Sequence, residues 1–140
     1  MLLFTLCESY MVASVAAKTD PNIVIQAAAV TGLIVLSITV FAMTTSMDFV
    51  LLGPILIIIL SMSLAMSMIF MFVFFFDKLR VVYCTIGVII FSIYLIIDTQ
   101  LIMGGKRYQV EVDDYILGAI ILYTDIIMIF LYLIRLFSKR

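Results

Sequence analysis

The 140-residue chain contains no histidine and no tryptophan, and it has only two prolines and two cysteines. The absence of histidine removes the commonest metal ligand and the commonest general base. Cys7 and Cys84 both lie within apolar stretches, where we interpret them as buried packing residues rather than as a disulfide. No nucleophile–base pair, phosphate-binding loop or metal-ligand spacing is found. We therefore predict that the chain is not an enzyme and has no cofactor and no metal site.

Charge is also scarce. Only 12% of the residues are charged, whereas 66% are hydrophobic, and the formal net charge is −1. This charge supplies no basic surface for a nucleic acid, so we exclude nucleic acid as a partner. The hydrophobic fraction is far above that of a soluble domain. We predict one integral membrane domain over residues 1–140, with the lipid bilayer around it.

Long apolar runs dominate the chain. About 20 helical residues cross a bilayer, and five runs reach or approach this length: Met1–Ala17, Asn22–Met43, Leu51–Phe76, Arg80–Met103 and Asp114–Phe137. The runs are continuous rather than alternating, which favours helices over strands. We therefore predict an all-α, polytopic transmembrane helix bundle of about five spans.

Polar residues between the runs predict where helices begin and end. Pro21 suits the first turn of the second span, and Asp48 suits an N-cap before the third. The first span is short, and the small residues 13–16 resemble the cleavage site of a signal peptide. A retained helix is the preferred interpretation, because no basic segment precedes it and Glu8 interrupts its apolar core.

Two aspartates, Asp98 and Asp125, lie inside the fourth and fifth runs. A charged side chain near the bilayer centre costs about 2.5–3.5 kcal/mol on insertion scales, so such residues usually face the bundle interior and serve a function. Counted from the predicted helix ends, the two residues lie roughly 9 Å apart along the membrane normal, so contact requires helix tilt or a longer fourth helix. If they meet, both cannot be ionised cheaply, and the pair would share a proton and titrate as a unit.

Small and aromatic residues recur on the helix faces that carry the two aspartates. They are Gly87, Phe91 and Tyr94 on the fourth span, and Gly118 and Tyr132 on the fifth. Such faces are typical of a helix–helix seam rather than of a lipid-facing surface.

We predict that Asp98 and Asp125 form a proton-sharing, gating pair, with Glu8, Tyr94 and Tyr123 as intramembrane polar partners. Two carboxylates are too few to store Ca²⁺, which needs six to eight oxygen ligands, so Ca²⁺ would be a permeant ion. The alternative is that the aspartates are non-conducting staples that hold the bundle together. Residue chemistry alone leaves both hypotheses open.

Five segments resemble, in order and spacing, the C-terminal part of the transmembrane Bax-inhibitor-motif family, and within it the lifeguard, glutamate-receptor-associated branch. The segments are Phe4–Glu8, Asp48–Gly53, Tyr94–Lys106, Asp113–Ile127 and Phe130–Leu136. Members of this family have about seven spans, and this chain matches the last five. The resemblance implies a multi-pass protein of the endoplasmic reticulum, Golgi or plasma membrane that leaks stored calcium slowly and suppresses apoptosis.

The resemblance also implies roles for particular residues. In bacterial relatives two aspartates of the last two helices share a proton and close the pore, and by position these correspond to Asp98 and Asp125. An arginine from the second helix completes that latch, and this chain has no segment matching that helix. The alternative functions are a non-conducting protein that associates with full-length relatives, receptors or itself, and an incomplete record of a longer gene.

The sidedness of the chain stays open. With five spans, most lysines and arginines outside the helices, including Lys18, Lys78 and Lys139, fall on the side of the C-terminus. This bias predicts a cytosolic C-terminus. The family topology, with seven spans from a cytosolic N-terminus, implies a lumenal one instead.

Overall fold

The computed structural model describes residues 2–55, 57–59, 61–62, 77–103 and 115–138, and the regular structure within these ranges is helical. The elements are α1 (Leu2–Ala17), α2 (Pro21–Thr44), the 3-10 helix η1 (Phe49–Leu52), α4 (Asp77–Ile102) and α5 (Tyr115–Phe137). Short helical stretches at 53–55, 57–59 and 61–62 follow η1. The all-α prediction is confirmed.

Within the described ranges, three helices are long and apolar enough to cross a membrane, and they match the second, fourth and fifth predicted spans. The apolar helix α1 has 16 residues, fewer than the about 20 of a complete crossing. Most of the third predicted span lies outside the described residues, as do Gly104, Gly105, Asp113 and Asp114. A total of five spans therefore stays a prediction.

The helix starts agree with the polar residues that precede them. Pro21 occupies the first turn of α2, and the Asp20 carboxylate accepts a 2.9 Å hydrogen bond from the backbone N–H of Asn22. Asp48 caps η1 by accepting from the N–H of Val50 at 3.2 Å. Each cap satisfies a backbone donor that the first helical turn leaves free. The expected roles of Pro21 and Asp48 are confirmed.

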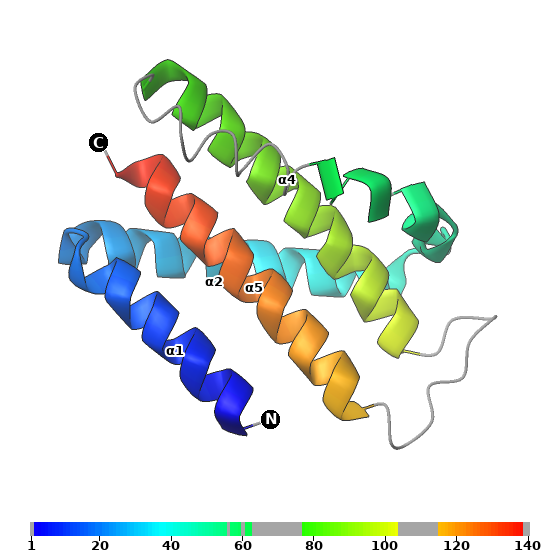
Figure 1. The fold of residues 1–140 in the computed structure, drawn as a ribbon. Helices are drawn as coiled ribbons and strands as arrows, with labels where there is room; N and C mark the ends of the chain where they lie inside the picture. The colour runs from blue at the N-terminus through cyan, green and yellow to red at the C-terminus, as the bar shows by residue number, and fades with distance from the viewer. Residues whose placement is uncertain (1, 56, 60, 63–76, 104–114, 139–140) are drawn as a thin grey trace.

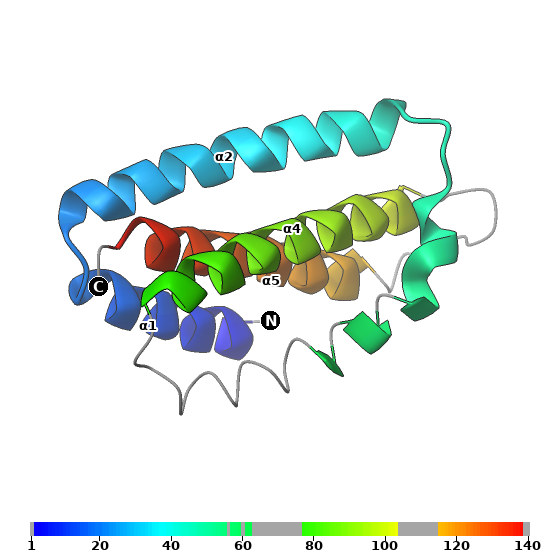
Figure 2. The same cartoon turned by 90° about the horizontal axis from the view of Figure 1, so that it is seen from above.

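The helices α4 and α5 form an antiparallel pair at the centre of the fold (Figure 1), and α2 packs against both of them. Figure 2 shows α2 running along one side of this pair. Helix α1 packs chiefly against α5 and has no buried residue. The pair α4–α5 therefore positions the two aspartates, and α2 supports it from one side.

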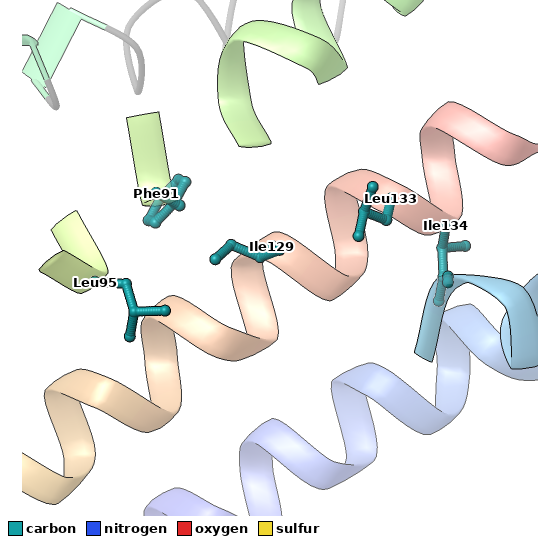
Figure 3. Close-up of a cluster of buried hydrophobic side chains, with 6 residues drawn as sticks. Phe91, Leu95, Ile129, Leu133 and Ile134 are labelled. Carbon is teal, nitrogen blue, oxygen red and sulfur yellow. The ribbon is translucent and has the colours of Figure 1, made fainter. Parts of the chain in front are cut away.

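The core lies where these three helices meet. Its buried members are Ala27 of α2, Phe91 and Leu95 of α4, and Ile129, Leu133 and Ile134 of α5. In Figure 3 the side chains of Phe91 and Leu95 lie across from Ile129. Lipid is as apolar as these side chains, so close packing rather than exclusion from water holds such helices together.

The outer face of α2 carries large, exposed apolar side chains. Ile25, Leu33 and Leu36 are each 67% exposed. Exposed apolar residues on a helix of this length are the surface that a bilayer covers.

Both cysteines are free, but only one is buried as the sequence led us to expect. Cys84 on α4 is 1% exposed, whereas Cys7 on α1 is exposed. The interpretation of Cys7 as a buried packing residue is wrong, because α1 lies at the edge of the bundle and buries none of its side chains.

Candidate functional site

Two glycines allow the close approach of α4 and α5. A Cβ atom added to Gly87 would lie 2.7 Å from the ring of Tyr132, and one added to Gly118 would lie 3.0 Å from the side chain of Ile102. Small residues at such positions let the backbones of two membrane helices come together. The expected seam along these helix faces is therefore present.

The seam brings the side chains of Asp98 and Asp125 together, close enough for a hydrogen bond between their carboxyl groups. Asp98 is half-buried and Asp125 is 6% exposed. The Oδ2 atom of Asp125 is fully buried and accepts no hydrogen bond from an N–H or O–H group in the described part of the chain. A carboxylate has no donor, so a hydrogen bond between two carboxyl groups requires one proton on the pair.

Helix α4 ends one residue earlier than expected, so an extension of its C-terminal end does not bring the two aspartates together, and the stagger of α4 against α5 contributes instead. Helix α4 ends at Ile102, whose side chain lies against Gly118, the fourth residue of α5. This stagger of three residues shifts α5 by about 4.5 Å along the seam. It removes about half of the offset that level helix ends would impose.

Apolar contacts lie on both sides of the pair along the seam. Leu95, one turn before Asp98, and Ile129, one turn after Asp125, are 1% and 0% exposed. On the other side Ile102 packs over Gly118. The carboxyl groups are therefore enclosed between two apolar layers, where a change in their charge has a large electrostatic effect.

The three other predicted site residues occupy different places. Tyr94 lies one turn from Asp98, with its ring centroid 6.0 Å from that of Phe91. The ring of Tyr123 makes an edge contact with Phe4 at 6.4 Å and so faces α1. Glu8 is half-buried on α1. The structure therefore brings together Asp98 and Asp125, whereas Tyr123 and Glu8 lie toward the α1 side of the bundle.

A second polar contact on the same seam was not expected from the sequence. The hydroxyl groups of Tyr83 and Tyr132 lie 3.3 Å apart, and their ring centroids are separated by 5.8 Å. Tyr83 precedes Gly87 by four residues and so lies on the face that carries Asp98. This spacing was the signal that could have identified it.

The described residues contain no group of three or more His, Cys, Asp or Glu side chains close enough to hold a metal ion. The aspartate pair alone offers two carboxyl groups, which is too few for stable Ca²⁺ coordination. Two adjacent carboxyl groups can share one proton and then titrate as a unit.

Comparison with known proteins gives matches over the whole chain. Protein lifeguard 3 of Homo sapiens and its Mus musculus counterpart are 30% and 29% identical over 143 residues, which cover 100% of this chain and 46% of each relative. Protein LIFEGUARD 4 of Arabidopsis thaliana is 34% identical over 141 residues, covering 96% of this chain and 54% of the relative. The chain thus spans about half the length of these relatives.

A family model described as "Inhibitor of apoptosis-promoting Bax1" matches residues 1–140. Together with the lifeguard relatives and the membrane-length helices of the fold, this match assigns the chain to a family of integral membrane proteins. The protein belongs to the Bax-inhibitor family.

Proposed function

We propose that the chain provides a slow, pH-sensitive leak for Ca²⁺ in the membrane of the endoplasmic reticulum, the Golgi or the cell surface, and thereby regulates calcium homeostasis and suppresses apoptosis. The family description supports the link to apoptosis. The observation that carries the gating mechanism is the proximity of the Asp98 and Asp125 carboxyl groups in the seam of two membrane-length helices. That the chain is not an enzyme stays a prediction.

In the proposed mechanism, the shared proton keeps the seam closed. Its loss leaves two carboxylates facing each other between apolar layers. At a separation of about 4 Å and an effective dielectric constant of about 20, two such charges repel by about 4 kcal/mol. This repulsion separates α4 from α5 and admits water, and a divalent cation entering the gap offsets the two negative charges. Flux should therefore rise as the pH rises.

Reconstitution in liposomes tests the proposal. Vesicles that carry the wild-type chain are expected to release Ca²⁺ faster as the pH rises, whereas Asp98→Asn/Asp125→Asn vesicles release it at one rate at every pH. The reason is that two amides hydrogen-bond to each other without titrating. A calcium-sensitive dye measures the release. An unchanged pH dependence in the double variant, or no release above that of protein-free vesicles, would contradict the proposal.

A second function is favoured by the exposed state of α1. This helix has no fully buried residue, and its apolar side chains Leu2, Leu3 and Leu6 are exposed. Helix α1 would then bind a full-length relative, and the chain would regulate that protein without conducting. In that case the reconstituted chain passes no Ca²⁺ but co-purifies with a co-expressed full-length lifeguard protein.

A further inference from the structure

Gln100 of α4 ties this helix to a distant part of the chain. Its Nε2 donates a hydrogen bond to the carbonyl oxygen of Met47 at 2.9 Å. Its Oε1 accepts one from the backbone N–H of Phe49, also at 2.9 Å. The amide thus binds backbone groups on both sides of Asp48, more than 50 residues earlier in the sequence. We call residues 45–49, which link α2 to η1 and include the first residue of η1, the α2–η1 connector.

The other hydrogen bonds of the α2–η1 connector are local. The N–H of Thr45 donates to the carbonyl oxygen of Phe41 at 2.9 Å, and the Asp48 carboxylate accepts from the N–H of Val50 at 3.2 Å. The Phe49 ring packs against that of Phe41 with a centroid separation of 6.0 Å. Among the described residues, the hydrogen bonds that join the connector to α4 or α5 both come from Gln100. Figure 2 shows the chain descending from the end of α2 to the C-terminal end of α4.

Gln100 lies close to the aspartate pair but on another side of α4. Two residues correspond to about 200° of rotation around a helix. Asp98 faces α5, where it bonds to Asp125, and Gln100 faces the connector. Contacts on two nearly opposite sides of α4, from Asp98 and from Gln100, therefore hold this helix near the same height. A rotation of α4 that separates Asp98 from Asp125 must also act on the bonds of Gln100.

We propose that Gln100 is a positioning residue that couples the α2–η1 connector to the Asp98–Asp125 pair. Its two bonds hold α4 at the rotation in which the carboxyl groups meet, and opening of the pair releases the connector. The coupling rests on the proposed function in one respect, because the closed pair is taken to block the leak. Through this coupling, the connector at the end of the bundle also influences whether the aspartate pair is closed.

Within the part of the chain that the structure describes, few titratable groups lie near Gln100. Helix α2 and η1 contain no ionisable side chain. On α4 and α5 these groups are Asp98, Tyr94, Asp125, Tyr123 and the exposed Tyr115 at the start of α5. On the connector there is the exposed Asp48, whose carboxylate accepts from the N–H of Val50. The basic Arg80 and Arg135 lie toward the opposite ends of their helices.

Hydrogen exchange measured by mass spectrometry tests the tether independently of conduction. Gln100→Leu, which keeps the bulk but not the bonds, should raise the hydrogen-exchange rate of peptides covering 45–49 by about tenfold, which corresponds to a loss of about 1.4 kcal/mol. Gln100→Asn withdraws the amide by one methylene and should act in the same way without placing an apolar side chain there. The control is Gln26→Leu, because Gln26 is an exposed glutamine of α2. In this variant, peptides covering 45–49 should exchange hydrogen at the wild-type rate.

The pH profile tests the coupling. Without the tether the closed arrangement is weaker, so Gln100→Leu and Gln100→Asn should reach half-maximal Ca²⁺ release at a pH lower by about one unit, for a loss of about 1.4 kcal/mol. Gln26→Leu should leave this pH unchanged. Unaltered exchange in both Gln100 variants would overturn the proposal. Faster hydrogen exchange of 45–49 with an unshifted pH profile of Ca²⁺ release would also overturn it, because Gln100 would then be only a structural tether.

If the wild-type chain shows no pH-dependent release of Ca²⁺, the proposed function fails. The coupling is then tested by hydrogen exchange alone. Exchange of 45–49, corrected for its intrinsic pH dependence, is then compared between the wild type and Asp98→Asn/Asp125→Asn. A rise with pH that occurs only in the wild type supports coupling between the pair and the connector. The same profile in both proteins overturns it.

Discussion

Replacing Gly87 with alanine is expected to destabilise the chain by about 1–3 kcal/mol, the usual cost of overpacking. The added methyl group would lie 2.7–2.8 Å from three ring atoms of Tyr132. That ring has little freedom to move away, because it packs against Phe91 and Tyr83 at centroid distances of 5.8 Å and its hydroxyl lies 3.3 Å from that of Tyr83. The two helices would have to separate instead, which weakens the whole seam.

The matched control is Gly32→Ala on α2, where an added Cβ would have no neighbour within 4 Å. This change should be neutral or stabilise the chain by up to about 1 kcal/mol, because alanine has the higher helix propensity. Thermal unfolding in detergent micelles measures both variants. Adding Tyr132→Leu to Gly87→Ala should recover part of the loss. Equal stability of Gly87→Ala and Gly32→Ala would mean that the helices do not approach closely at Gly87.

The single substitution Asp125→Asn should lock the leak closed. In the wild type the hydrogen bond between the carboxyl groups needs a proton, so the closed state is present at low pH and lost as the pH rises. The amide introduced by the substitution donates to an ionised Asp98 without any added proton. Release of Ca²⁺ should therefore stay at its low-pH level across the whole range, measured in liposomes over a series of pH values.

The substitution Asp125→Leu removes both the hydrogen-bonding group and the ionisable group at position 125. It leaves the half-buried Asp98 without its partner, which should lower stability by about 1–3 kcal/mol. The variant has neither a shared proton nor a second carboxylate to repel Asp98, so release should lose the wild-type response to pH. Asp20→Asn is the control, since Asp20 is exposed and asparagine caps a helix equally well. A wild-type pH response in Asp125→Asn would show that the shared proton is not the switch.

The sequence determined the class of the protein and the helices that can cross a membrane. An apolar run of about 20 residues must satisfy its own backbone hydrogen bonds in lipid, and a helix does this within one segment. Local signals such as Pro21 placed the start of α2 within one residue of its position in the structure. The fixed period of the helix also showed which residues share a face with each aspartate, and these faces form the α4–α5 seam.

Only the tertiary structure decided how the helices align. The stagger that sets Ile102 against Gly118 reduces the offset between Asp98 and Asp125, which the structure places next to each other. The bonds from Gln100 to the α2–η1 connector join residues 51 and 53 positions apart. Periodicity and capping act over one or two helical turns and carry no information about the relative height of two helices. That height depends on how the side chains of separate segments fit together, and it determines whether two aspartates in apolar helices can share a proton.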